Sequence, residues 1–128
     1  MTIKFPEIEQ AILKAFDATV KYFKQEMTRQ LETVKWQWDG TITIRRNGQA
    51  VGSPRDIVDT KKLRDSLFEN RLAENFAELI YGTIYAALVH EGYTTSTGKR
   101  KPARPWIIEA VDESNLLQFF AEDRKSVV

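Results

Sequence analysis

Residues 6–34, PEIEQAILKAFDATVKYFKQEMTRQLETV, predict one long amphipathic helix. Proline suits the first turn of a helix, and the acidic residues Glu7 and Glu9 suit its positive end. Apolar side chains recur every three or four residues, namely Ile8, Ile12, Phe16, Val20, Phe23, Met27, Leu31 and Val34. A helix of this length spans roughly 40 Å at 1.5 Å per residue. Because such a rod is too long for the rest of a small domain to cover, we expect part of its apolar stripe to contact another subunit.

The composition indicates a single globular domain over residues 1–128. Hydrophobic residues make up 42% and charged residues 29% of the chain, which is ordinary for a protein with its own core. The formal net charge of +1 provides no strong overall field toward nucleic acid or membrane. The absence of cysteine excludes disulfides and cysteine-ligated zinc. With no signal-peptide pattern and no run of membrane-spanning length, we expect a soluble protein that is made in the cytoplasm and has no membrane partner.

The predicted helix is followed by a segment with the alternation of a β-strand. Trp36 and Trp38 alternate with polar residues, and the run TITI at 41–44 is β-branched throughout. Asn47-Gly48 is a two-residue hairpin signal of type I′, a turn that needs positive φ at both positions. We therefore predict a projecting hairpin or arm over residues 36–54.

The middle of the chain combines a short helix with a predicted β-hairpin. Asp59 or Thr60 can cap a short helix that points Leu63 and Leu67 inward. The run SLFENRLAENFAELIYG at 66–82 then fits two strands that turn near its middle, and a helix competes for the same residues.

A short helix, a polar loop and a final helix complete the predicted fold. TIYAALVHEG predicts a helix that Gly92 ends in the left-handed conformation. A mobile basic loop follows over residues 93–101, Pro105 opens the last helix, and residues 123–128 form a frayed tail. The buried face of the last helix comprises Trp106, Ile107, Ala110, Val111, Leu117, Phe120 and Ala121. We therefore predict an α+β fold with a long N-terminal helix, a small antiparallel sheet with a projecting hairpin or arm, a short middle helix and a C-terminal helix.

No stretch of the sequence carries a complete catalytic or metal-binding motif. His90-Glu91 begins an HExxH pattern, but Thr94 stands where the second histidine belongs. A nucleophilic pair of Ser66 and His90 lacks any sequence mark of an orienting carboxylate or an oxyanion hole. His90 therefore fits the C-terminus of a helix, where an imidazole satisfies end carbonyls. We expect no enzyme, metal or cofactor, and a hydrolase centred on His90 is the alternative.

The basic cluster near the predicted loop comprises Lys99, Arg100, Lys101 and Arg104. With Tyr93 and Trp106 nearby, this cluster can contact a phosphate backbone or a partner protein. Pro102 and Pro105 restrict the backbone around Arg104, whose planar fork can bind a carboxylate or carbonyls at two points. We expect KPARPW to act as a rigid clasp for the last helix, and a solvated Arg104 is the alternative.

Two separated stretches, VDTKKLRDSL at 58–67 and YAALVHEG…KPARPWIIEAVDE at 85–113, carry short motifs in order. The first resembles DTG-x-L-R-x-S, and the second resembles YA-x-x-V-(H/E)-x-G … ARPF-x-x-P-A, both motifs of the tail-component family of tailed bacteriophages. The matching positions are Asp59, Thr60, Leu63, Ser66, Tyr85, His90, Gly92, Arg104, Pro105 and Trp106. Lys61 replaces the usual glycine, Trp106 replaces the usual phenylalanine, and residues 36–52 lie outside the pattern.

The resemblance implies a structural virion protein without catalytic activity. Members of this family are small neck or tail-completion proteins, so it implies a homo-oligomeric ring, commonly a hexamer, at the head–tail junction. The implied partners are head connector or adaptor proteins, tail tube or terminator proteins, and genomic DNA in transient, non-specific contact within the lumen. The protein would be synthesised in the cytoplasm of the bacterial host. The alternatives are a tail terminator and a small nucleic-acid-binding protein that uses the Lys99–Arg104 loop.

Overall fold

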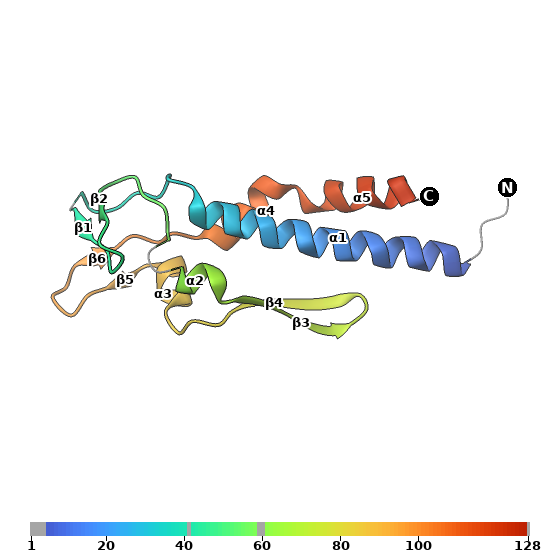
Figure 1. Cartoon of the computed structure of the whole chain (residues 1–128), viewed down its shortest axis with the longest axis horizontal. Helices are drawn as coiled ribbons and strands as arrows, with labels where there is room; N and C mark the ends of the chain where they lie inside the picture. The colour runs from blue at the N-terminus through green and yellow to red at the C-terminus, as the bar shows by residue number, and fades with distance from the viewer. Residues whose placement is uncertain (1–4, 41, 59–60, 128) are drawn as a thin grey trace.

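The computed structural model of the protein describes residues 5–40, 42–58 and 61–127. Its elements form an elongated α+β fold, in which α1 (Phe5–Glu32) runs along the long axis (Figure 1). The sequence predicts this helix over residues 6–34, and the observed helix ends slightly earlier, at Glu32. The fold class and the long N-terminal helix are therefore confirmed.

Two helices, α4 (Trp106–Ser114) and α5 (Leu116–Val127), pack along α1, where the sequence predicts a single helix. Asn115 separates them with φ 50° and ψ 57°, a left-handed conformation that asparagine tolerates better than most residues. The Tyr22 hydroxyl donates to the Ser114 carbonyl oxygen at 3.1 Å, which satisfies one of the carbonyls that this helix end exposes. The predicted fraying of residues 123–128 stays a prediction.

The buried face predicted for the last helix is only partly correct. Trp106 and Ala110 are fully buried, and Ser114 continues the same face at the next turn. Val111 lies off this face and is 48% exposed, and Leu117 lies beyond the break and is 84% exposed. The interruption between the two helices therefore changes which apolar side chains contact α1.

On the opposite side of α1 lies an antiparallel hairpin of β3 (Leu67–Ala73) and β4 (Phe76–Tyr81) (Figure 1). The sequence predicts these two strands, and the hairpin is confirmed. Leu67 is therefore a strand residue, because the preceding helix α2 (Lys62–Asp65) ends before it. Leu67, Leu79 and Tyr81 pack toward the core, and the alternate side chains point away from α1.

Two smaller hairpins lie at the end of the molecule remote from the start of α1 (Figure 1). β1 (Thr43–Ile44) pairs with β2 (Ala50–Val51), and β5 (Tyr93–Thr94) pairs with β6 (Arg100–Lys101). Within the described residues, the strands thus form three separate two-stranded sheets. The segment predicted as a polar loop is a short hairpin, and its mobility stays a prediction.

Both small hairpins use a three-residue loop with glycine in its last position. Gly48 has φ 88° and its N–H donates to the Arg45 carbonyl at 2.9 Å. Gly98 has φ 83° and its N–H donates to the Thr95 carbonyl at 3.0 Å. The type I′ turn predicted at Asn47-Gly48 is wrong, because Asn47 is not among the described residues with positive φ. A type I turn followed by a left-handed glycine forms the loop instead.

The core lies where the C-terminal half of α1 meets the start of α4. Its buried members are Met27, Leu31, Trp36, Ile57, Leu63, Trp106 and Ala110. Trp36 donates its ring N–H to the Gln30 carbonyl at 2.8 Å, so the start of the predicted arm is anchored on α1. A bridge between Trp36 and Arg55 brings the end of the arm back beside its beginning. Both the first and the last residues of the arm are therefore held next to the C-terminal end of α1.

Candidate functional site

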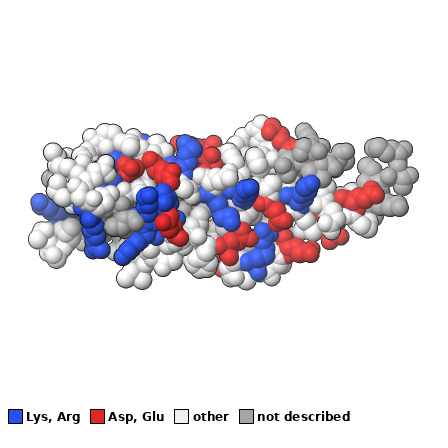
Figure 2. Space-filling view, viewed as in Figure 1, with Lys and Arg blue, Asp and Glu red and all other residues white. Residues whose placement is uncertain are grey.

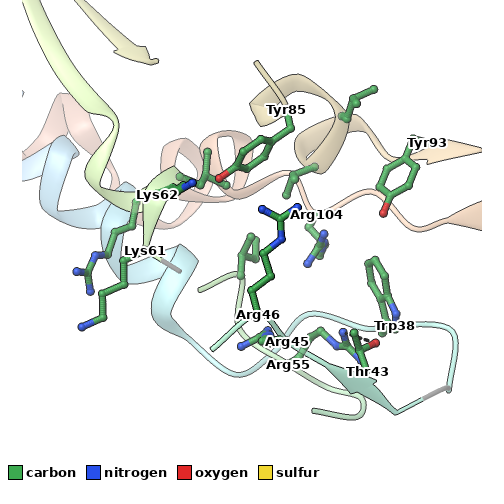
Figure 3. Close-up of a pocket in the computed structure, with 15 residues that line it drawn as sticks. Trp38, Thr43, Arg45, Arg46, Arg55, Lys61, Lys62, Tyr85, Tyr93 and Arg104 are labelled. Atoms are coloured by element: carbon green, nitrogen blue, oxygen red, sulfur yellow. Dashed lines mark hydrogen bonds between the residues drawn. The ribbon is translucent and has the colours of Figure 1, made fainter. Parts of the chain in front are cut away.

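A pocket with a volume of about 570 Å³ opens at the end of the molecule that carries the small hairpins. It lies between the arm, α2, α3 (Ala86–Glu91) and the segment around Arg104 (Figure 3). Its basic lining residues are Arg45, Arg46, Arg55, Lys61, Lys62, Arg64 and Arg104. No Asp or Glu among the described residues lines it. We call this site the cationic pocket.

Basic side chains also gather on the outer surface at the same end of the molecule. Lys and Arg dominate the end with the small hairpins, and acidic side chains dominate toward the start of α1 (Figure 2). The nearly neutral net charge of +1 therefore conceals a strongly uneven distribution.

Arg45 lines the pocket and forms an ion pair with Asp56. Its guanidinium is largely buried and donates to Asp56 Oδ1 at 2.7 Å. The same group donates to the carbonyl oxygens of Val58 at 2.6 Å and Asp56 at 2.8 Å. This arginine therefore fixes the path of the chain behind the pocket.

Arg55 donates hydrogen bonds to oxygens at both ends of the small β1–β2 hairpin. Its guanidinium donates to the carbonyls of Gly52 at 2.7 Å and Val51 at 3.0 Å, and to Thr43 Oγ1 at 3.2 Å. Burial lowers the pKa of Arg55, and the neighbouring Arg45 charge lowers the pKa further. The nearby charges of Asp39 and Asp56 oppose this shift and raise the pKa of Arg55.

Arg104 lines the pocket and is fixed by its own backbone. Its backbone N–H donates to the Val89 carbonyl at 3.1 Å, and its carbonyl accepts from Trp106 N–H at 2.8 Å. These bonds tie the end of α3 to the start of α4, the role predicted for the KPARPW clasp. The residue is only 9% exposed, so the alternative of a solvated arginine is wrong.

The Arg104 guanidinium lies over the Trp38 ring, with its central carbon 4.5 Å from the ring centroid. Its buried Nε has no hydrogen-bond partner among the described residues, and the predicted two-point contact with a carboxylate or carbonyls is not formed. Burial lowers the pKa of Arg104 to about 10, and the charges of Arg55 and Arg45 add to this effect. At neutral pH the group therefore stays charged in a partly dry, positive environment.

The remaining residues of the predicted basic cluster point to different places. Lys101 pairs with Asp39 and lies 5.3 Å from the centroid of the Trp38 ring. Arg100 donates to the Glu91 carbonyl at 3.1 Å, which caps the end of α3. Lys99 lies on the exposed turn of its hairpin. Only Arg104 of the four lines the cationic pocket.

His90 and Ser66 do not form the pair that a hydrolase would need. The His90 ring packs edge-on against Trp106, with centroids 5.1 Å apart, and its buried Nε2 has no hydrogen-bond partner among the described residues. The predicted bonding of this imidazole to helix-end carbonyls is therefore not observed at Nε2. Ser66 donates its hydroxyl to the Leu63 carbonyl at 2.7 Å, so it closes α2.

We predict that the His90 environment makes the fold less stable in mild acid. Burial holds the pKa of His90 below its ordinary value of 6.5, although Glu91 opposes the shift. Since the unfolded chain then binds more protons, stability is complete above pH 6.5 and decreases as the pH falls below that value. Thermal melts between about pH 5.5 and pH 7.5 should show this loss, and His90→Gln should reduce it. An identical pH dependence in the variant would contradict the assignment.

The other motif positions have structural roles. Leu63 is a core residue, and Tyr85 is a half-exposed residue on the wall of the cationic pocket. Gly92 has φ 81° and ψ 168°, so the predicted left-handed helical ending is wrong. A Cβ at Gly92 would lie 2.8 Å from the Lys101 carbonyl oxygen, which explains the need for glycine. Asp59 and Thr60 lie outside the described residues.

Lys61 has a left-handed backbone, with φ 69° and ψ 3°. This is the position at which the bacteriophage motif usually carries glycine, and a side chain there is strained. From the sequence, the turn at Lys61 either avoids positive φ or adopts it at an energetic cost. The structure shows the second case.

Searches against family models, curated proteins and solved structures found nothing that matches this chain. None of the helices in the described part of the chain is both long and apolar enough to cross a membrane. Likewise, no group of His, Asp or Glu side chains in that part could hold a metal ion.

Proposed function

We propose that this chain is a structural protein of a tailed bacteriophage, which forms a ring of identical copies at the head–tail junction. In this role the ring joins the head connector to the tail and lets DNA pass through its lumen. The proposal rests on the two motifs described above, and the left-handed backbone at the motif's glycine position supports it. A tail terminator ring is the alternative role within the same kind of particle.

The observation that carries the proposal is the set of large apolar side chains that stay exposed on the β3–β4 hairpin and around α3. On the β3–β4 hairpin, Phe68, Leu72 and Phe76 are 50%, 55% and 53% exposed. Leu88 on α3 is 52% exposed, and Ile84 just before that helix is 99% exposed. Large exposed side chains of this kind, repeated along neighbouring elements, favour burial against another protein. An assembling subunit needs such a surface, and identical subunits in head-to-tail contact can close a ring.

Removal of the chain from the particle tests the proposed function. We expect cells infected without it to accumulate DNA-filled heads and separate tails, and the supplied protein to restore joined particles. Normal joined particles without the chain would contradict the proposal.

A small nucleic-acid-binding protein is the second candidate, favoured by the basic end of the molecule. The exposed Lys99 and Arg100 lie at the start of β6, at the end of the molecule that carries the small hairpins and the cationic pocket (Figure 1). Under the ring proposal, DNA must slide through the lumen, so we predict that its binding is weak, independent of sequence and lost in moderate salt. Titration of duplex DNA at several salt concentrations measures this. Tight, sequence-specific binding at physiological salt would favour the second candidate.

A further inference from the structure

We propose that the cationic pocket receives the acidic and apolar first turns of α1 from a neighbouring copy of this chain. The inference rests on the proposed ring and specifies one contact within it.

Three basic side chains of the pocket, those of Arg104, Lys61 and Lys62, form no ion pair with a carboxylate in the described part of the chain. Arg104 is only 9% exposed as a residue, and its buried Nε has no hydrogen-bond partner in that part. Lys61 and Lys62 on the rim of the pocket are exposed and form no ion pair with any residue in the described part of the chain. Figure 3 shows Arg104 facing the cavity, with the two lysines on one side of it. Buried cations without counter-charges are unfavourable, so the site is suited to oxyanions.

The aromatic and apolar lining favours a protein segment over a nucleic acid. Trp38 cannot act as a free platform for a base, because the cations of Arg55 and Arg104 lie 4.8 Å and 4.5 Å from its ring centroid. The remaining wall includes the apolar side chains of Leu88 and Val89. A ligand that fills this pocket well therefore combines carboxylates with apolar groups.

The first turns of α1 have this combination. Glu7 and Glu9 are exposed and form no ion pair with any described residue. Ile8 is 39% exposed and Ile12 is 38% exposed, next to the two glutamates. The first turns of α1 lie at the opposite end of the molecule from the small hairpins beside the pocket, so a copy cannot fill its own site (Figure 1). Docking between successive copies is therefore head to tail, the kind of contact that closes into rings.

Paired charge reversals test the contact in the full-length protein. Lys61→Glu with Lys62→Glu reverses the rim of the pocket, and Glu7→Lys with Glu9→Lys reverses the docking turns. We expect each pair alone to reduce the yield of joined particles by about tenfold or more, because like charges then face each other. We expect the two pairs combined in one chain to restore most of the yield. Thermal melts establish that each variant folds.

Lys21→Glu with Gln25→Glu is the control, since it places two carboxylates at exposed positions of α1 outside both the pocket and the docking turns. We expect near-normal yield from this control. Loss without rescue in the combined variant would overturn the docking, as would unchanged yield in either pair alone. A pocket reversal that abolishes oligonucleotide binding by the isolated protein, again without rescue, would assign the pocket to nucleic acid instead. These results leave the ring itself in place, whereas the proposed function fails if joined particles form without the chain.

Discussion

Replacement of Trp106 by alanine is expected to lower the free energy of unfolding by about 3–5 kcal/mol. Trp106 is completely buried at the start of α4. Its ring meets Tyr81 of β4 and His90 of α3 edge-on, with centroids 5.3 Å and 5.1 Å away. Loss of the ring leaves a cavity where three elements join, so the cost includes lost contacts as well as lost apolar burial. Denaturant unfolding followed by circular dichroism measures the change.

Trp106→Phe is the matched control and introduces the residue usual in the bacteriophage motif. The Trp106 ring N–H is buried without a hydrogen-bond partner among the described residues, so phenylalanine loses no such bond there. We expect a loss of about 1.5 kcal/mol or less, because an aromatic ring still fills most of the space. A loss below about 1 kcal/mol for the alanine variant would contradict the central place assigned to this side chain.

Replacement of Phe68 by lysine is expected to prevent head–tail joining while the fold stays intact. Phe68 pairs with Ile80 on the outer side of the β3–β4 hairpin and is 50% exposed, so the isolated subunit loses little packing. In a subunit interface, the same change places a charge on an apolar surface, which is strongly unfavourable. We expect the yield of joined particles to fall by about tenfold or more, measured by complementation of particles that lack the chain.

Gln25→Lys controls for the added charge, since Gln25 is an exposed polar residue of α1 outside the apolar face. This variant should complement normally. Wild-type yield from the Phe68 variant would show that the outer face of the hairpin is free in the particle.

Periodic elements could be predicted from the sequence because each signal is local. The apolar period of residues 6–34 and the alternation in residues 66–82 predict a long helix and a hairpin, and both elements agree with the structure. The predicted stripe is only partly buried, because Met27 and Leu31 lie in the core whereas Ile8, Ile12 and Val34 are exposed. The break at Asn115 has no comparable signal, because the apolar pattern continues past it and only the left-handed backbone reveals it. The loop at Gly48 likewise fits two hairpin geometries in sequence.

The candidate site was predictable only in part. Arg104 and its neighbouring prolines form a recognisable local pattern, so the link to the last helix could be predicted, but the Arg104 backbone forms it and not the predicted two-point contact of the guanidinium. The pocket itself depends on contacts between distant segments, in which Trp38 from the arm lies beneath Arg55 and Arg104. The spacing of these residues along the sequence does not indicate that they meet in one pocket. The sequence around Arg45 likewise does not mark it as a pocket residue.

The reconstruction of joined particles that contain this chain tests the proposed ring most directly. Our account predicts a closed ring of identical copies at the head–tail junction, with DNA in its lumen and the outer face of the β3–β4 hairpin buried against a neighbouring protein. Density for this chain in the capsid shell, along the tail tube or at the tail tip, with none at the junction, would contradict it.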